Sequence, residues 1–175
     1  MNGRRRGRAN QGGPPVDPAE RAREIALRLL DHSPRSCAQL REGLLAREVD
    51  PEVAEQVIQR YVEVGLLDDG ALAATIVRTR HRERGQSRRA IHQELRRKGF
   101  DASDIESALD QIGPEDESVA AHALAEARWR RLAGQDDQTR VRRVVAMLGR
   151  KGYPPSLAFE VVRALQRADN VGGST

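Results

Sequence analysis

Residues 88–100 read RRAIHQELRRKGF, and this stretch decides the fold because its pattern occurs three times in the chain. Residues 37–49 read CAQLREGLLAREV, and residues 141–153 read VRRVVAMLGRKGY. All three copies carry an apolar residue at the fourth, eighth and thirteenth positions. The copies start at 37, 88 and 141, so they are 51 and 53 residues apart. Such a period is typical of a protein built from supersecondary repeats.

The fourth and eighth positions of each copy are four residues apart, so they share one face of an α-helix. The core residues predicted at these places are Leu40, Leu44, Ile91, Leu95, Val144 and Leu148. The twelfth position is Gly99 in the second copy and Gly152 in the third, where a left-handed helix C-cap favours glycine. The first copy has Glu48 there. Each copy is therefore predicted to hold a helix that ends in a sharp turn.

Helix-start signals add a helix on each side of the repeated stretch. Asp17-Pro18 with Glu20 combines an N-cap residue, a first-turn proline and a capping-box glutamate. Asp50-Pro51 opens the third helix of the first unit in the same way. In that unit we expect helices from 17 to 31, from Ser36 onward, and from 51 onward in a unit that ends near 67. In the later units we expect helices at 69–84, 87–98, 102–112, 116–132, 137–150 and 155–168.

These elements predict an all-α protein of three tandem three-helix repeats that form an elongated, curved array. No alternating apolar segment bounded by hairpin-type dipeptides is present, so strands are not expected. The predicted repeats cover 17–67, 68–114 and 115–168. Residues 1–16 and 169–175 lack periodicity and are predicted to be disordered tails.

The composition suits thin helical layers and excludes several classes of protein. Only 3% of the 175 residues are aromatic, so aliphatic side chains must fill the core. No apolar run approaches the roughly 18 residues of a membrane span, and the Arg-rich start lacks the apolar part of a secretion signal. We therefore expect a cytoplasmic protein with no membrane partner. Cys37 is the only cysteine, which excludes an intrachain disulfide.

The sequence contains no motif for catalysis or for a cofactor. It has no phosphate-binding G-x-x-x-x-G-K-[ST] loop, no G-x-G-x-x-G and no G-x-S-x-G. The four histidines have neither cysteine partners at finger spacing nor an H-E-x-x-H pattern. We expect no enzyme activity, no cofactor and no metal site.

The net charge of +4 hides an alternation along the chain. Residues 17–77 hold 7 basic and 12 acidic residues, while 78–98 hold 9 and 2. Residues 99–127 hold 8 acidic residues and no basic one, and 128–151 hold 8 basic and 2 acidic residues. Two basic bands separated by an acidic one suit phosphates or an acidic partner surface. The alternative is that each band is a solvated helix face.

Over residues 17 to 166 the chain resembles the RecX family of regulatory proteins. The resemblance rests on Gly65-Leu66-Leu67-Asp68-Asp69, on Gly85 and Arg88 to Leu95, and on Lys98-Gly99-Phe100 with its echo at Leu148 to Tyr153. It implies a non-catalytic protein of three three-helix repeats that binds the RecA recombinase and enters the groove of its filament on DNA. It also implies inhibition of strand exchange and of coprotease activity. The first unit departs from the pattern at Glu48, and the third has Tyr153 in place of Phe100.

The basic residues of the second and third repeats are the candidate binding residues. Arg89, His92 and Arg96 lie opposite the core positions Ile91 and Leu95 on one helix. The planar fork of arginine suits bidentate contact with phosphate or carboxylate. The predicted partner- and DNA-binding residues are Arg78, Arg80, Arg82, Arg84, Arg88, Arg89, Arg96, Arg97, Lys98, Arg128, Arg130, Arg131, Arg140, Arg142, Arg143, Arg150 and Lys151.

Some interpretations remain open from the sequence. Trp129 lies among arginines, so it either packs in the core or stacks on a base or a partner. Asp68 and Asp69 either cap a helix or contact a partner. The expected partners are RecA and its DNA filament, with weak non-specific binding to single- or double-stranded DNA by a monomer. The alternative function is a stand-alone helix-turn-helix transcriptional regulator.

Overall fold

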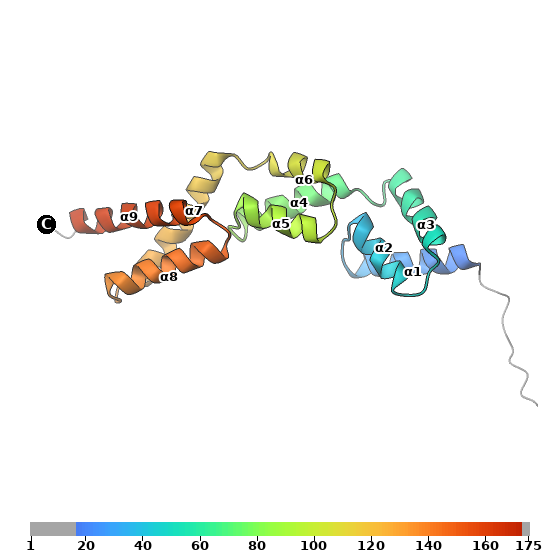
Figure 1. Cartoon of the computed structure of the whole chain (residues 1–175), viewed down its shortest axis with the longest axis horizontal. Coiled ribbons are helices and arrows are strands. Elements are labelled where there is room, and N and C mark those ends of the chain that lie inside the picture. The colour runs from blue at the N-terminus through green and yellow to red at the C-terminus, as the bar shows by residue number, and fades with distance from the viewer. Residues whose placement is uncertain (1–16, 173–175) are drawn as a thin grey trace, which may run out of the picture. The chain divides into compact units, whose positions relative to one another are not determined.

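The computed structural model describes residues 17–172, which contain nine α-helices and no strand (Figure 1). The helices are α1 (Pro18–His32), α2 (Cys37–Leu45), α3 (Pro51–Glu63), α4 (Asp69–Arg82), α5 (Arg88–Arg97), α6 (Ala102–Leu109), α7 (Pro114–Arg131), α8 (Asp137–Arg150) and α9 (Pro155–Gly172). They divide into unit 1, with described residues 17–35 and 39–67, and unit 2, with residues 36–38 and 68–172. The tail predicted at 1–16 and the last residues 173–175 lie outside the described residues.

Short polar side chains explain where most helices begin. In the first turn of its helix, a backbone N–H donates a hydrogen bond to each of Asp17, Asp50, Asp68, Ser87 and Asp136. These bonds satisfy N–H groups that have no partner within the helix. The capping interpretation of Asp68 is thereby confirmed, and α4 begins where the sequence predicts.

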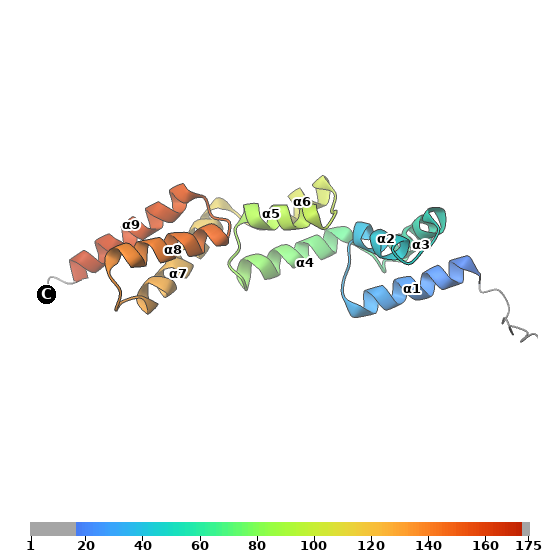
Figure 2. The same ribbon diagram turned by 60° about the horizontal axis from the view of Figure 1, so that its bottom comes forward.

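Unit 1 packs α1 against α3, with α2 on the same side of α1 (Figure 2). Its buried residues are Ala22, Ala26, Leu29, Leu40, Leu44, Ala54, Val57, Ile58, Tyr61 and Leu67. The hydroxyl of Tyr61 donates to the carbonyl of Arg23 at 3.3 Å and joins α3 to α1. Gly43 lets α2 approach α1, because a Cβ at that position would lie 2.8 Å from Cδ1 of Leu29.

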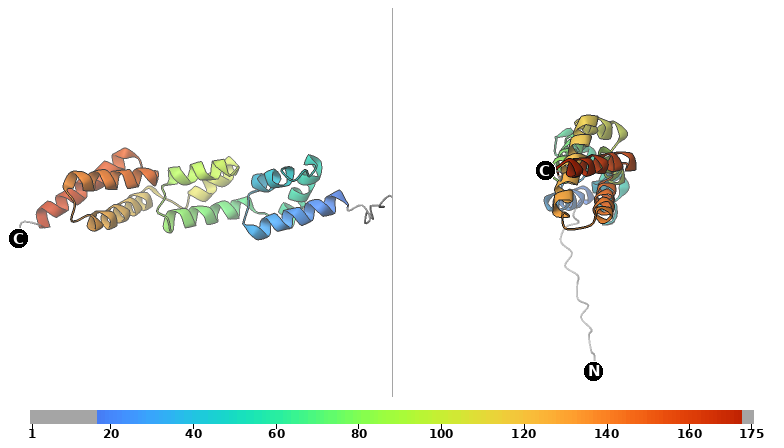
Figure 3. Two further views of the ribbon diagram at one scale, coloured as in Figure 1. Left: turned by 90° about the horizontal axis from the view of Figure 1, so that it is seen from below. Right: turned by 90° about the vertical axis from the view of Figure 1, so that its left-hand side faces the viewer.

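Unit 2 contains two groups of three helices, α4 to α6 and α7 to α9 (Figure 3). Each group has its own apolar core. In the first core, Ile91 and Leu95 of α5 pack with side chains of α4 and α6. In the second, Val144 and Leu148 of α8 pack with Trp129 and with residues of α9. The six core positions predicted from the repeat are all 0% exposed. The predicted all-α class with three three-helix repeats is confirmed, while the curvature of the array and the exact repeat boundaries stay predictions.

The turn that follows each repeated helix has a left-handed residue, as the glycine pattern indicates. The backbone φ is +76° at Gly99 and +91° at Gly152. Glu48 adopts the same region with φ +60°, although this region disfavours a residue with a side chain. The three repeats therefore share their turn geometry even where the sequence departs from glycine.

Helix α9 is longer than the sequence predicts. It continues to Gly172, so the expectation of a disordered tail from Asp169 onward is wrong for residues 169–172. The carboxylate of Asp169 accepts a hydrogen bond from Nε1 of Trp129 at 2.8 Å, which holds this part of α9 against α7. The apolar periodicity of the sequence does not reveal this polar contact.

Candidate partner-binding surface

Helix α5 presents an exposed basic stripe on the side opposite to its core face. Arg89 and Arg96 are exposed, whereas Ile91 and Leu95 on the other side are fully buried. His92 lies between the two arginines in the stripe and is half-buried, with its Nε2 3.8 Å from Oε1 of Glu106. In the described part of the chain, no carboxylate lies within ion-pair distance of Arg89 or Arg96. The predicted orientation of this stripe is confirmed, and its role in binding stays a prediction.

Arg80 does not belong to the exposed set. Its guanidinium makes a two-pronged contact with Glu94 of α5, with Nε to Oε2 and Nη2 to Oε1 both at 2.8 Å. The two side chains are only 21% and 16% exposed. The hydrogen bond from Arg80 lowers the pKa of Glu94 below its ordinary value, and Glu94 raises the pKa of Arg80 in return. The pair joins α4 to α5, and this engagement leaves the guanidinium poorly placed for an outside phosphate.

Arg88 is also held by its own fold. Its Nη1 donates to the carbonyls of Leu109 at 2.6 Å and Ile112 at 3.3 Å, which lie at and after the end of α6. Its backbone N–H donates to Oε1 of Glu117 at 2.7 Å. The side chain therefore caps carbonyls that the helix leaves without partners, a structural use of a residue that the sequence assigns to binding.

The second and third repeats meet at a junction that brings their basic bands together. The backbone N–H of Ser87 donates to the carbonyl of Lys151 at 2.9 Å, and Nζ of Lys151 donates to the carbonyl of Arg84. Gly152 permits this approach, since a Cβ there would lie 2.6 Å from Cβ of Ala90. The exposed Arg84 and its neighbours are thus placed beside the end of α8, which carries the exposed Arg150. Two stretches that are far apart in sequence contribute to one basic region.

Arg140 does not belong to the exposed surface, and its contacts lie within the third repeat. Its side chain is 11% exposed and its Nη1 lies 2.8 Å from Oδ2 of Asp169. The guanidinium stacks on the ring of Trp129, 3.9 Å from the ring centroid. Hydrogen bonds from Trp129 and Arg140 lower the pKa of Asp169. Trp129 itself is buried, which decides between core packing and base stacking in favour of the core.

The remaining candidates differ in exposure but are mostly unpaired. Arg130 lies 3.4 Å from Glu126 in an exposed pair on one helix. Half-buried candidates are Lys98, Arg128 and Lys151. Exposed candidates without a carboxylate in ion-pair distance among the described residues are Arg78, Arg82, Arg84, Arg97, Arg131, Arg142, Arg143 and Arg150. The surface therefore offers guanidinium groups that can bind a phosphate or carboxylate without first breaking an internal ion pair.

The sequence analysis did not identify the carboxylates that pair with Arg80, Arg88 and Arg140. Four carboxylates contact the side chain or the backbone N–H of a predicted binding residue: Glu94, Glu106, Glu117 and Asp169. Glu106 has a signal in the repeat, because the 51-residue period places the pair Arg41–Glu55 of unit 1 on His92 and Glu106. Asp169 has none, since it lies 40 residues from Trp129.

The described residues hold no cluster of three or more side chains suited to a metal ion. Within the same residues, no helix has the length and apolar character needed to cross a bilayer.

Comparisons with known proteins agree with this architecture. Models of the first, second and third three-helix domains of RecX match residues 22–60, 68–109 and 115–162. The regulatory protein RecX of Streptomyces coelicolor is 47% identical over 156 residues, which cover 89% of this chain and 83% of that protein. The regulatory protein RecX of Thermobifida fusca is 41% identical over 157 residues, covering 90% of this chain and 85% of that protein.

Solved structures show the same fold. The crystal structure of RecX from Lactobacillus salivarius superposes with a TM-score of 0.73 at 19% identity, over 86% of this chain and 98% of that chain. A crystal structure of a regulatory protein RecX superposes with a TM-score of 0.69 at 30% identity, over 85% of this chain and 73% of that chain. Matches to all three domains and the high identity over most of the chain lead to one conclusion: the chain belongs to the RecX family of regulatory proteins.

Proposed function

We propose that this chain regulates the RecA recombinase by binding RecA and its filament on DNA, and that binding inhibits recombinase and coprotease activity. The observation that carries the proposal is the exposed arginine surface of unit 2 in a family of regulatory proteins. In this mechanism the chain acts by occupying a site on the filament and catalyses no reaction. A protein seated on the filament obstructs a second DNA strand and the coprotease substrates, and it competes with packing between recombinase protomers. We place this monomeric protein in the cytoplasm.

The arginines of α5 and of the junction supply contacts to DNA phosphates in this proposal. Each phosphate contact releases counterions, so affinity for DNA falls as salt rises, with a slope near −0.7 to −0.9 per contact. The binding is sequence-independent because phosphates carry no sequence information. Weak non-specific attraction to single- or double-stranded DNA then adds to the contacts with RecA.

The test is an assay of RecA ATP turnover on single-stranded DNA and of strand exchange, with and without the purified chain. We expect the chain to lower both activities and to hydrolyse no nucleotide by itself. If RecA is unaffected at a severalfold molar excess of the chain over filament protomers, the proposal is wrong.

A double charge reversal locates the contact. Arg89→Glu with Arg96→Glu should weaken filament and DNA binding and give a shallower salt slope, while the fold stays intact because both side chains are exposed. The matched control is the same reversal at Arg23 and Arg60, two exposed residues of unit 1. A double variant that inhibits RecA as well as the unaltered chain does, with the same salt slope, would show that the stripe is only a solvated face.

Deleting residues 1–16 tests the contribution of the tail. This deletion removes Arg4, Arg5, Arg6 and Arg8, which is four positive charges. It should reduce attraction to DNA and leave the inhibition of RecA. A transcriptional regulator would behave differently, since it would bind one DNA site far more tightly than random DNA and would leave RecA unaffected.

A further inference from the structure

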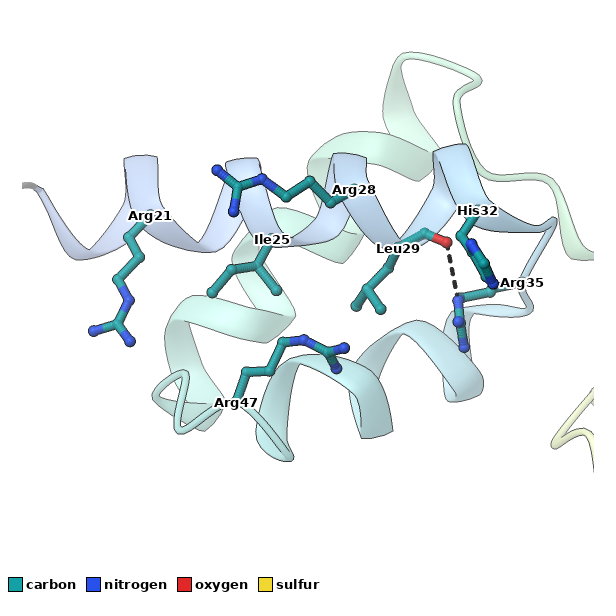
Figure 4. Close-up of a pocket in the computed structure, with 7 residues that line it drawn as sticks. All are labelled: Arg21, Ile25, Arg28, Leu29, His32, Arg35 and Arg47. Carbon is teal, nitrogen blue, oxygen red and sulfur yellow. Dashed lines mark hydrogen bonds between the residues drawn. The ribbon is translucent and has the colours of Figure 1, made fainter.

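Unit 1 contains a groove between α1 and α2 that the basic bands of the sequence do not predict. It has a volume of about 530 Å³, within the range of ligand-binding pockets. Its floor is Ile25 and Leu29, two side chains that α1 directs toward α2 (Figure 4). Around the floor stand Arg21, Arg28, His32, Arg35 and Arg47. Among the described residues that line it there is no carboxylate.

The spacing on α1 explains why cations gather here although residues 17–77 are acidic as a whole. Positions 21, 25, 28 and 32 recur every three or four residues, so they share one helix face. The acidic Glu24 lies beside this face, where its carboxylate is 3.3 Å from the exposed Arg28. The face extends over about 16 Å, the length of roughly five residues of extended peptide.

Two of the arginines are held in position before any ligand binds. Nε of Arg35 donates to the carbonyl of Leu29 at 3.1 Å, and Nη1 of Arg47 donates to the carbonyl of Gly43 at 2.9 Å. Both carbonyls lie in the last turn of a helix, where the helix dipole is negative, and each guanidinium keeps further N–H groups that can donate to an anion. Within the described residues, no carboxylate lies in ion-pair distance of Arg21, Arg35 or Arg47. Anchored donors lose less conformational entropy when they bind.

We propose that this groove binds an acidic peptide segment of a protein partner, with one or two aliphatic side chains seated on Ile25 and Leu29 and carboxylates on the surrounding arginines. The combination of an apolar floor with a cationic rim favours such a segment over a phosphate chain, which has no aliphatic group for the floor. The chain's own N-terminal segment 1–16 is excluded by charge, since it carries four arginines and no acidic residue. The proposal concerns unit 1 alone and stands apart from the binding of RecA.

The test measures anisotropy of a fluorescein-labelled dodecapeptide with six glutamates around two leucines two residues apart, titrated with the full chain, because this spacing in an extended peptide matches one helical turn from Ile25 to Leu29. Neither recombinase nor DNA is present, so the result is independent of the proposed function. Arg21→Gln with Arg47→Gln should weaken peptide binding about fivefold or more, because two charge-assisted contacts are lost. The matched control, Arg23→Gln with Arg60→Gln, removes the same charge from the same unit, and affinity should change less than about twofold.

Two further probes separate the floor from the charges. A peptide with both leucines replaced by serine should bind more weakly than the leucine peptide. A labelled (dT)12 oligonucleotide should bind the groove variant and the control variant equally. The proposal fails if the serine peptide binds as tightly as the leucine peptide, if both variants lose peptide affinity equally, or if the groove variant loses (dT)12 and not the peptide. Circular dichroism at 222 nm checks that each variant is folded.

Discussion

Replacing Gly152 by alanine should break the junction that unites the two basic bands, and the structure allows the cost to be worked out. Gly152 has φ +91°, and an added Cβ would lie 2.5 Å from Oγ of Ser87 and 2.6 Å from Cβ of Ala90. A left-handed conformation costs a residue with a side chain about 1–2 kcal/mol. The overlap adds about 1–3 kcal/mol, because neither Ala90 nor the adjoining backbone has a flexible end that can move away. The two terms predict a loss of about 2–5 kcal/mol in the free energy of unfolding.

Gly65 supplies the matched control for this prediction. It has φ +72° and no atom within 4 Å of an added Cβ, so Gly65→Ala carries only the backbone term of about 1–2 kcal/mol. Urea unfolding followed by circular dichroism compares the two variants, and fluorescence of Trp129, the single tryptophan, reports on the third repeat. The Gly152 variant should also inhibit RecA less at equal concentration. Equal losses of stability in the two variants would refute the close approach at the junction.

Further predictions concern single residues of unit 2. Leu95→Ala should lower the free energy of unfolding by about 2–5 kcal/mol, because the side chain is fully buried, and an unchanged urea midpoint would contradict the repeat register. Tyr153→Phe should raise the free energy of unfolding by about 1 kcal/mol, because the buried Tyr153 hydroxyl has no hydrogen-bond partner among the described residues. The equivalent residue of the second repeat is Phe100, and a loss of stability in thermal melts would contradict this prediction. Arg80 holds the pKa of Glu94 below its ordinary 4.5, so the stabilisation is complete above about pH 4.5 and is lost as the pH falls through the lowered folded-state pKa. Thermal melts from about pH 6 to pH 3 should therefore show a larger decline for the unaltered chain than for Glu94→Gln, and identical declines would refute the role of the pair.

Periodicity in the sequence predicts the parts of the fold that depend on helix geometry. Leu40, Ile91 and Val144 are equivalent by spacing alone, and all three are fully buried. The exposure of Arg89 and Arg96 follows from the same 3.6-residue period, because a residue opposite a buried face must point outward. These predictions need no knowledge of how one helix packs on another.

The parts that the sequence could not predict depend on contacts between distant residues. Arg140 and Trp129 look like binding residues in a basic band, yet both are buried and contact Asp169, which lies beyond the last periodic position. The groove of unit 1 was not predicted from the sequence for a related reason. A charge count along the chain adds Glu20, Glu24 and Asp31 to the basic residues of α1, whereas only basic and apolar residues line the groove.

The division of the arginines into paired and unpaired groups has a consequence for binding. Arg80 and Arg140 are largely shielded from solvent and already contact carboxylates, so binding a phosphate would exchange one anion for another. At Arg80 the exchange would also leave the poorly exposed Glu94 unpaired. Arg89 and Arg96 are exposed, so binding a phosphate there displaces only water. The paired charges nearby cancel each other, which leaves the positive potential on the exposed side of α5. The proposed preference of phosphates for α5 therefore depends as much on the internal carboxylates as on the exposed arginines. Removing Glu94 would release Arg80 to compete for the same phosphates and would spread the binding surface from α5 onto α4.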